Sequence, residues 1–191
     1  RDYNVTYTGD FDTKGATVTS DPYFGKKIAG GRYVSGEGSY IEHIGNHYYL
    51  FMSYGGLEPN GGYEMRVFRS SRPYGPYKDM NGTDAIFTSW KLNYGPNADN
   101  RGEKLLGAYN HWGFMNVGER AQGHNSVLAA EDGRTYLVYH TKFNDGTAGH
   151  QVRVHQLFLN RSGWPVAAPF EFHGETTGDR QIASSQRFDS K

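Results

Sequence analysis

The sequence predicts an all-β fold built from short antiparallel strands. Aromatic residues make up 15% of the 191 positions and 26 are glycine, a combination typical of short strands joined by tight turns. Few segments space their apolar residues as an amphipathic helix does. The length is sufficient for one domain with a core of its own, or for part of a larger domain.

Apolar and aromatic runs bounded by glycine-rich turns predict the individual strands. In chain order they span residues 39–44, 48–54, 63–69, 126–130, 135–141 and 151–159. Residues 91–103 are expected to form a long exposed loop. Trp90 and Trp164 are expected in the core, and the segment "GWPV" around Trp164 is interpreted as a turn into a closing strand.

The strands belong to an internal repeat with an offset of 87 positions. "GEGS…YYLFMSY…GGYEMRVFRS" aligns without a gap with "GHNS…TYLVYHT…GHQVRVHQLF". The matched pairs are Gly36 and Gly123, Ser39 and Ser126, Tyr49 and Tyr136, Leu50 and Leu137, Gly62 and Gly149, Arg66 and Arg153, and Val67 and Val154. Repeated units of short strands are typical of β-propellers, in which each blade buries its faces against its neighbours.

The same alignment pairs Glu37 with His124 at the start of the first strand of each unit. First strands line the central channel of a propeller, so both side chains are expected to point into one axial cavity. A carboxyl in a partly dry cavity has a raised pKa and can donate a proton, as the acid of a glycosidase must. The alternatives are a solvated carboxylate for Glu37 and a buried hydrogen-bonding group for His124, whose ring can also ligate a metal.

Composition and charge exclude several other classes of function. The 20 basic and 20 acidic residues cancel, which argues against nucleic acid or an anionic membrane as a partner. No apolar run approaches the roughly 20 residues that cross a bilayer. The absence of cysteine excludes disulfides and thiolate metal sites, and it is compatible with a secreted or periplasmic bacterial protein.

Several segments taken together resemble glycoside hydrolase family 43, and most of all its arabinan endo-1,5-α-L-arabinosidases. They are "FGKKIAGGRYVSGEGSYI", "YYLFMSYGGL", "GGYEMRVFRSSRPYGPYKD", "AQGHNSVL", "TYLVYHTKF" and "VRVHQLFLNRSGWPVAAPF". The likeness extends from Phe24 to Glu175. It implies a five-bladed β-propeller, of which residues 1–175 would be the C-terminal portion of about three blades, followed by a polar tail over residues 176–191.

The resemblance also implies an activity and its residues. The family consists of inverting glycosidases, and Glu37 matches their general acid. His124 matches a histidine that contacts calcium or another cation near the axis, mostly through water. Tyr54 and Trp112 are candidates for stacking on arabinose rings, with strand packing as the alternative, and Asn125 is a candidate hydrogen-bonding group beside His124.

The sequence departs from the family in its other carboxylates. The base aspartate and the aspartate that orients the acid both precede the acid in the family, but only 36 residues precede Glu37 here. Asp10, Asp12 and Asp21 are the remaining candidates, and Asp21 precedes a segment that is a surface loop in the family. We therefore expect an N-terminal chain or fragment to complete the propeller and to supply the base.

Three functions remain open from the sequence. The first is an endo-acting enzyme that cleaves α-1,5-linked L-arabinan or arabino-oligosaccharides of the plant cell wall. The second is an exo-acting α-L-arabinofuranosidase or β-xylosidase, and residues 55–62 and 91–122 at the channel rim would decide between them. The third is a non-catalytic, carbohydrate-binding propeller.

Overall fold

The computed structural model describes residues 20–21, 25–32, 34, 36–107 and 116–174. These residues form strands, turns and loops, and no helix occurs among them. The strands are β1 (Ser20–Asp21), β2 (Gly25–Lys26), β3 (Glu37–Ile44), β4 (His47–Tyr54), β5 (Glu64–Ser70), β6 (Glu103–Leu106), β7 (Glu119–Ala129), β8 (Thr135–Phe143), β9 (Gln151–Leu159) and β10 (Pro165–Ala167).

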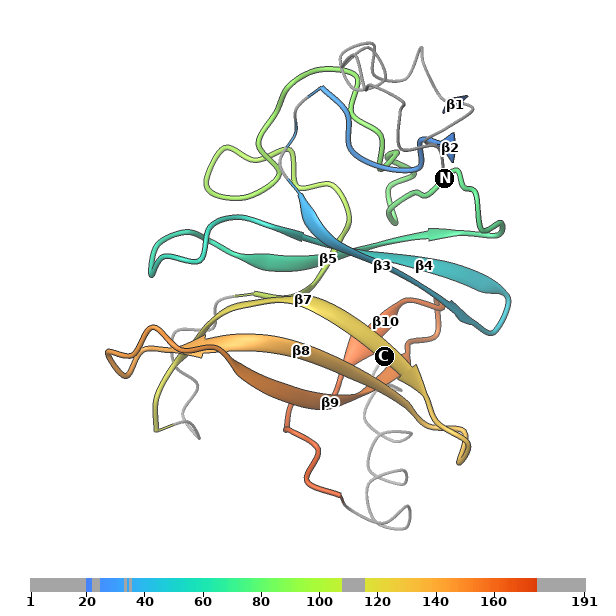
Figure 1. Ribbon diagram of the computed structural model, residues 1–191. Helices are drawn as coiled ribbons and strands as arrows, with labels where there is room; N and C mark the ends of the chain where they lie inside the picture. The colour runs from blue at the N-terminus through green and yellow to red at the C-terminus, as the bar shows by residue number, and fades with distance from the viewer. Residues whose placement is uncertain (1–19, 22–24, 33, 35, 108–115, 175–191) are drawn as a thin grey trace, which may run out of the picture.

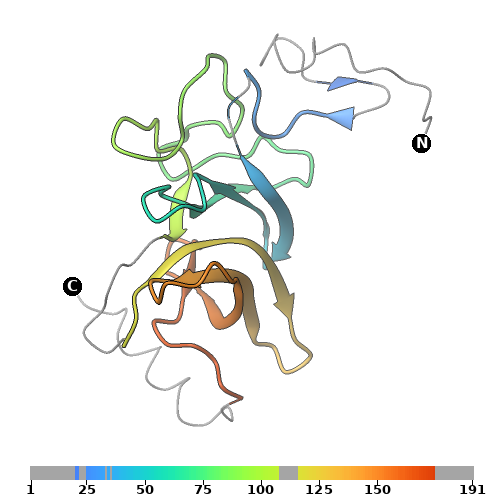
Figure 2. The same ribbon diagram turned by 60° about the vertical axis from the view of Figure 1, so that its left-hand side comes forward.

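Eight of the ten strands form two four-stranded antiparallel sheets that lie face to face (Figure 1). The first sheet, here called sheet I, has the order β3-β4-β5-β6, and the second, sheet II, has the order β7-β8-β9-β10. Neighbours in each sheet are therefore neighbours in the sequence. The short pair β1–β2 lies apart from both sheets (Figure 2). Each sheet has the order and the antiparallel pairing expected of a propeller blade.

The middle strands of the two sheets confirm the repeat. Tyr48 of β4 pairs with Ser70 of β5, and 87 positions later Thr135 of β8 pairs with Leu157 of β9. The same register continues along both hairpins. The similarity between the two segments thus reflects the same pairing of backbone groups, which a chance likeness between strand sequences would not produce.

The first strands do not follow the ungapped alignment. Glu37 lies opposite Ser53, whereas the residue opposite His140 is Gly123 and not His124. Both strands then bulge, and the residue after the paired one has a positive φ, 58° at Gly38 and 54° at His124. The backbone counterpart of His124 is therefore Gly38, which corrects the pairing of Glu37 with His124. The one-residue difference lies in the turn that follows, since four residues separate the paired His43 and Tyr48 whereas five separate the paired Ala129 and Thr135.

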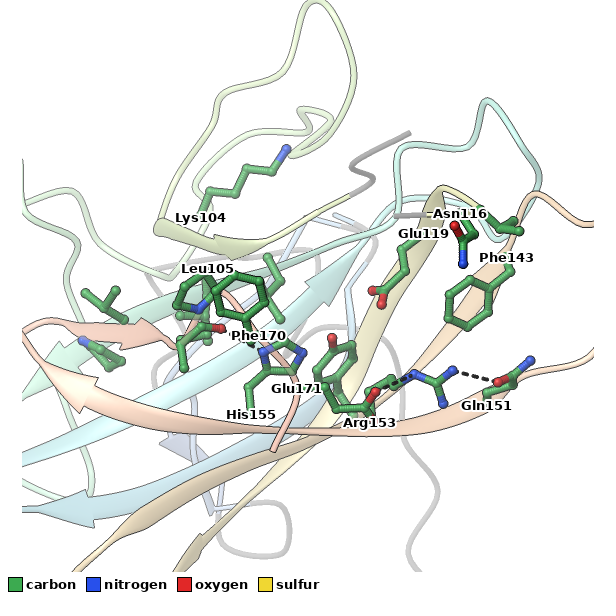
Figure 3. Close-up of a pocket in the computed structure, with 18 of the residues that line it drawn as sticks. Lys104, Leu105, Asn116, Glu119, Phe143, Gln151, Arg153, His155, Phe170 and Glu171 are labelled. Carbon is green, nitrogen blue, oxygen red and sulfur yellow. Dashed lines mark hydrogen bonds and ion pairs between the residues drawn. The ribbon is translucent and has the colours of Figure 1, made fainter. Parts of the chain in front are cut away.

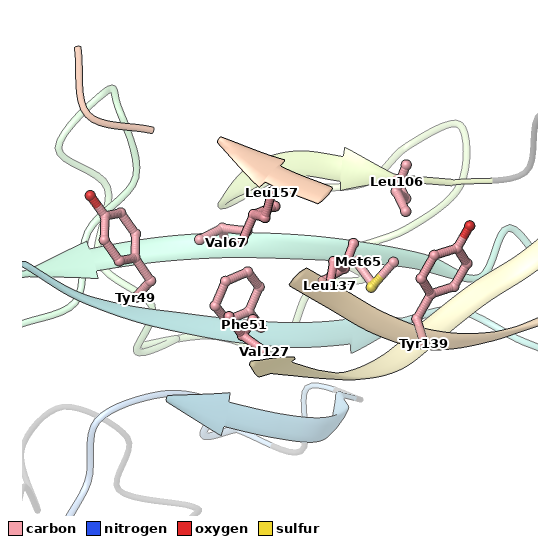
Figure 4. Packing of buried hydrophobic residues seen from close by; sticks show 9 residues of the cluster. All are labelled: Tyr49, Phe51, Met65, Val67, Leu106, Val127, Leu137, Tyr139 and Leu157. Carbon is pink, nitrogen blue, oxygen red and sulfur yellow. The ribbon is translucent and has the colours of Figure 1, made fainter. Parts of the chain in front are cut away.

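The main core lies between the two sheets (Figure 4). Sheet I contributes side chains from β4, β5 and β6, and sheet II contributes side chains from β7, β8 and β9. The cluster consists of Tyr49, Phe51, Met65, Val67, Leu106, Val127, Leu137, Tyr139 and Leu157. Because side chains alternate along a strand, the neighbouring residues of β4 point to the other face of sheet I.

That other face of sheet I forms a second core. It contains Leu50, Met52 and Tyr54 of β4, Phe68 of β5, and Tyr77 and Ala85 from the segment between β5 and β6. Leu50 thus points away from sheet II, whereas its repeat partner Leu137 points toward sheet I. The two sheets are therefore related by a rotation that repeats the same face order, as blades of a propeller are, and they do not mirror one another.

Because of this rotation, the face of sheet I that packs against sheet II corresponds to the face of sheet II that points away from sheet I. Met65 of sheet I is 0% exposed against sheet II, but its repeat partner Val152 is 66% exposed. Leu128 of β7 is also exposed, at 56%. Apolar positions that are buried in one blade are thus partly uncovered in the next.

About three blades are expected from the sequence, and the described residues form two four-stranded sheets and the pair β1–β2. One expectation about the core needs correction. Trp164 is buried as expected, at 3% exposure, but Trp90 is 64% exposed in the loop before β6. No helix in the described residues is long and apolar enough to cross a membrane.

Replacing Leu50 or Leu137 by alanine is expected to lower the free energy of unfolding by about 2–5 kcal/mol, because each leaves a cavity in a packed cluster. Leu128→Ala is the control, since the exposed side chain should change stability by about 0.5 kcal/mol or less. Urea denaturation measures the free energy of unfolding of all three variants. A cost at Leu137 no larger than at Leu128 would contradict the packing described above.

Candidate active site

The structure brings Glu37 and His124 together. Nδ1 of His124 lies 3.9 Å from Oε1 of Glu37, and the two side chains are 54% and 55% exposed. Glu37 begins β3 and His124 lies within β7, so the pair joins the first strands of both sheets. The expected juxtaposition of an acid and an imidazole is thus present in the described chain, with both groups open to solvent.

Two glycines create the space around Glu37. A Cβ atom at Gly36 would lie 2.8 Å from the ring of Tyr54, and one at Gly38 would lie 2.9 Å from Cα of His124. Gly38 also has a positive φ, which most side chains disfavour. The motif Gly36-Glu37-Gly38 therefore places a carboxylate where the backbone itself must approach its neighbours closely.

Tyr63, just before β5, holds the carboxylate. Its hydroxyl donates a hydrogen bond of 2.5 Å to Oε1 of Glu37, while its own side chain is buried at 1% exposure. Burial and the adjacent Glu37 carboxylate raise the pKa of Tyr63 well above its usual range. The phenol consequently remains protonated near pH 7 and able to donate to Glu37.

Ser53 of β4 connects the two sides of the site. It pairs with Glu37 across the β3–β4 ladder, and its Oγ accepts a hydrogen bond of 2.8 Å from the backbone N–H of His124. A further hydrogen bond between Ser53 and Tyr63 acts to lower the pKa of the phenol, against the larger effect of burial. Ser53 is completely buried, so this connection is shielded from water.

Two further histidines complete the group. The ring of His140 stacks on Tyr63 with centroids 5.7 Å apart, and it meets the ring of His150 edge to face at 4.6 Å. Burial, followed by the nearby His150 and His124, lowers the pKa of His140 to about 4, although Glu37 acts in the opposite direction. His140 is therefore neutral near pH 7 and adds no positive charge beside Glu37.

Tyr63, Ser53, His140 and His150 were not identified from the sequence, yet the repeat contains a signal for them. At the offset of 87, Ser53 aligns with His140 and Tyr63 aligns with His150. The two units thus have polar side chains at the same positions, but the residue types differ. Such positions, conserved in polarity within a repeat of apolar strands, indicate a shared site.

The three residues expected to bind substrate have different placements. Tyr54 is 2% exposed in the second core, so its ring is covered and is not available for stacking on a sugar; this placement agrees with the packing alternative. Asn125 is 4% exposed next to His124, and neither polar atom of its amide has a hydrogen-bond partner among the described residues. Trp112 lies outside the described residues.

The described residues do not form a protein-held metal centre. Among them, no group of three or more histidine, aspartate or glutamate side chains has the arrangement that would hold an ion. His124 offers one half-exposed imidazole, whereas calcium prefers six to eight oxygen ligands. Only an ion that keeps most of its water ligands would fit at this position.

A separate cavity of about 710 Å³ opens between β6 and the pair β9–β10 (Figure 3). Neither Glu37 nor His124 lines it. Its main charged group, Arg153, is already paired with Glu171 at 3.3 Å and with Gln151 at 2.8 Å. The charge of Arg153 is thus neutralised within the fold, and the candidate acid Glu37 lies outside this cavity.

Relatives of known activity are similar to this chain. The extracellular endo-α-(1→5)-L-arabinanase 2 of Bacillus subtilis (strain 168) is 43% identical over 166 residues, which is 80% of this chain and 34% of the relative. The crystal structure of an endo-1,5-α-L-arabinanase from Thermotoga petrophila RKU-1 superposes with a TM-score of 0.69 at 37% identity, covering 83% of this chain and 37% of that one.

A third relative was crystallised with a sugar bound. The structure of Cellvibrio cellulosa α-L-arabinanase complexed with arabinohexaose superposes with a TM-score of 0.54 at 27% identity, covering 70% of this chain and 36% of that one. The chain therefore spans about a third of the length of the relatives it matches. The sheets described above are accordingly part of a five-bladed propeller of the arabinanase type.

The match also extends to the family as a whole. The family model described as "Glycosyl hydrolases family 43" matches residues 5–165. This region includes all of sheet I and the strands of sheet II as far as Pro165, the first residue of β10. Glu37, Tyr63 and His124 all lie inside this region. The chain belongs to glycosyl hydrolases family 43.

Proposed function

We propose that this chain carries the acid of an inverting glycoside hydrolase that cleaves α-1,5-linked L-arabinan at internal bonds. The observation that carries the proposal is the Glu37 carboxyl, which is half exposed yet held by the buried Tyr63 hydroxyl beside His124. Two relatives that share this region are named endo-arabinanases. This favours the endo-acting enzyme over the exo-acting and the non-catalytic alternatives.

Glu37 would act on the leaving group. In its protonated form it donates a proton to the glycosidic oxygen as the bond to the anomeric carbon breaks, so that the departing sugar leaves as an alcohol. Inversion requires a second carboxylate about 6.5–9.5 Å away, on the opposite face of the sugar, to deprotonate the attacking water. The exposure of Glu37 leaves one side of its carboxyl free for a substrate.

The base carboxylate is a separate proposal. The polar contacts of Glu37 in the described chain come from Tyr63 and His124. Asp10 and Asp12 lie outside the described residues, and Asp21 lies in the separate pair β1–β2, where its side chain is not described. We propose that further polypeptide supplies the base and packs on the partly uncovered face of sheet II that carries Val152.

We propose that the protein acts outside the cytoplasm. Arabinan is a polymer of the plant cell wall that must be cut before uptake, and the Bacillus subtilis relative is named extracellular. The lack of cysteine is compatible with this location.

Glu37→Gln is expected to lower hydrolysis of linear arabinan by about 10²–10⁴-fold, because an amide is too weak an acid to protonate the leaving oxygen. Oligosaccharide products are separated by chromatography, and the unchanged protein should release a mixture of lengths, as an endo-acting enzyme does. Release of a single short product from the chain end would instead identify an exo-acting enzyme.

Glu42→Gln is the matched control, since Glu42 is a glutamate on the same strand. Its carboxylate accepts hydrogen bonds from the Tyr40 hydroxyl and from the backbone N–H of His43. Its activity should remain within about twofold. Sugar binding by Glu37→Gln, measured by calorimetry with arabinohexaose, should persist. If the unchanged protein binds arabinohexaose but releases no product, it is a carbohydrate-binding propeller and not an enzyme.

We propose further that His124 contacts a largely water-coordinated cation. His124→Ala should then weaken the binding of Ca²⁺ in calorimetry by at least about tenfold without changing the unfolding midpoint, because the exposed ring packs little surface. His43→Ala, which removes another exposed histidine, should leave Ca²⁺ binding unchanged. Equal Ca²⁺ binding by the two variants would contradict the proposal that His124 contacts a cation.

The proposal for the base predicts the composition of an active sample. Mass spectrometry of the active protein should detect polypeptide in addition to these 191 residues, and removal of that polypeptide should abolish turnover. A sample that contains only the 191-residue chain and hydrolyses arabinan would contradict this, and Asp21→Asn would then test the remaining candidate base within it.

A further inference from the structure

The hydrogen bond between Tyr63 and Glu37 joins a fixed group to a mobile one. Tyr63 is 1% exposed, whereas the Glu37 side chain is 55% exposed and would otherwise sample several rotamers. The 2.5 Å contact ends on Oε1, and Nδ1 of His124, at 3.9 Å, faces the same oxygen. Both neighbours therefore gather on one side of the carboxyl.

The ring of Tyr63 is held by close packing. Its face stacks on His140 with an interplanar angle of 22°. Its edge lies so close to Gly123 that a Cβ there would be 2.1 Å from Cε1 of Tyr63. The turn before it is equally tight, because a Cβ at Gly55 would lie 2.8 Å from Cα of Tyr63. The ring and its backbone are thus packed closely against their neighbours.

The direction of the hydrogen bond follows from the chemistry of its two groups. The carboxylate of Glu37 has no proton to donate, so the Tyr63 hydroxyl donates and Oε1 accepts. The phenol proton is then available for Oε1 of Glu37. A protonated carboxyl has one O–H, and it sits on the oxygen that does not receive a hydrogen bond. In Glu37 that oxygen is Oε2.

We propose that Tyr63 is a positioning residue for the acid: it binds Oε1 of Glu37 so that Oε2 carries the proton to the leaving oxygen. This rests on the proposed function of Glu37 and deepens it. Tyr63 itself does not touch the reacting atoms. Without the Tyr63 hydroxyl the Glu37 carboxyl would rotate. Either oxygen could then carry the proton, and the O–H would point in several directions. Misplacement of a catalytic group by about 1 Å can cost about 100-fold in rate.

The test is Tyr63→Phe in the active protein that contains these residues. Two substrates are compared: linear arabinan, whose leaving group needs a proton, and an aryl arabinotrioside with a 4-nitrophenol leaving group, which needs little. We expect kcat on arabinan to fall by about 10–100-fold with KM changed by less than about twofold. On the aryl substrate the loss should be less than about threefold.

Tyr49→Phe is the matched control. The Tyr49 hydroxyl also makes a hydrogen bond of 2.5 Å, to the carbonyl of Gly163, and its side chain is also fully buried. Its removal should change both substrates equally and by less than about twofold. An equal loss on both substrates for Tyr63→Phe, or a change in KM alone, would overturn the proposal.

A crystal structure of Tyr63→Phe separates this inference from the proposed function. The Glu37 carboxyl should lose its single position while the backbone of β3 remains in place. If the unchanged protein does not cleave arabinan, the proposed function fails, but a displaced carboxyl would still show that Tyr63 positions Glu37. A carboxyl that stays in place without the phenol would overturn the positioning role, whatever the substrate.

Discussion

The close approach of β3 to β7 is the constraint on which the other features of the molecule depend. The two strands begin different sheets, and the approach is possible because Gly38 has no side chain where His124 lies. A hydrogen bond of 3.0 Å from the Tyr40 hydroxyl to the carbonyl of Val127 fixes the strands further along. With the strands at this distance, the two sheets share one core, and the acid and the imidazole meet at its edge.

The site combines two units that have the same backbone but different chemistry. Sheet I supplies a carboxylate and two hydroxyls, and sheet II supplies three imidazoles, one of which is kept neutral by burial. A repeated fold fixes positions with high precision because its strands pair in the same register twice. Variation of side chains at the fixed positions then yields an asymmetric site within a nearly symmetric frame.

The sequence predicted the fold better than the site. The middle strands carry apolar side chains on both faces, so their register could be read from an alignment without a gap. The bulge of β7 could not, because His124 adopts a positive φ that is more usual for glycine, and nothing in its immediate sequence marks it. Trp90, expected in the core, is exposed in a loop without strand periodicity, where hydrophobicity does not determine burial. Tyr63 was counted as a strand residue, and only its three-dimensional neighbours show what its hydroxyl does.

The order of strands within each sheet has a consequence for how the chain folds. Because consecutive strands are neighbours, every connection within a sheet closes a short loop except the long segment between β5 and β6, so most contacts within the sheets are local. The docking of β3 against β7, by contrast, joins distant parts of the sequence. Glu37 and His124 therefore meet only where the two sheets are docked, so that a chain with separated sheets would hold the components of the site but not their geometry.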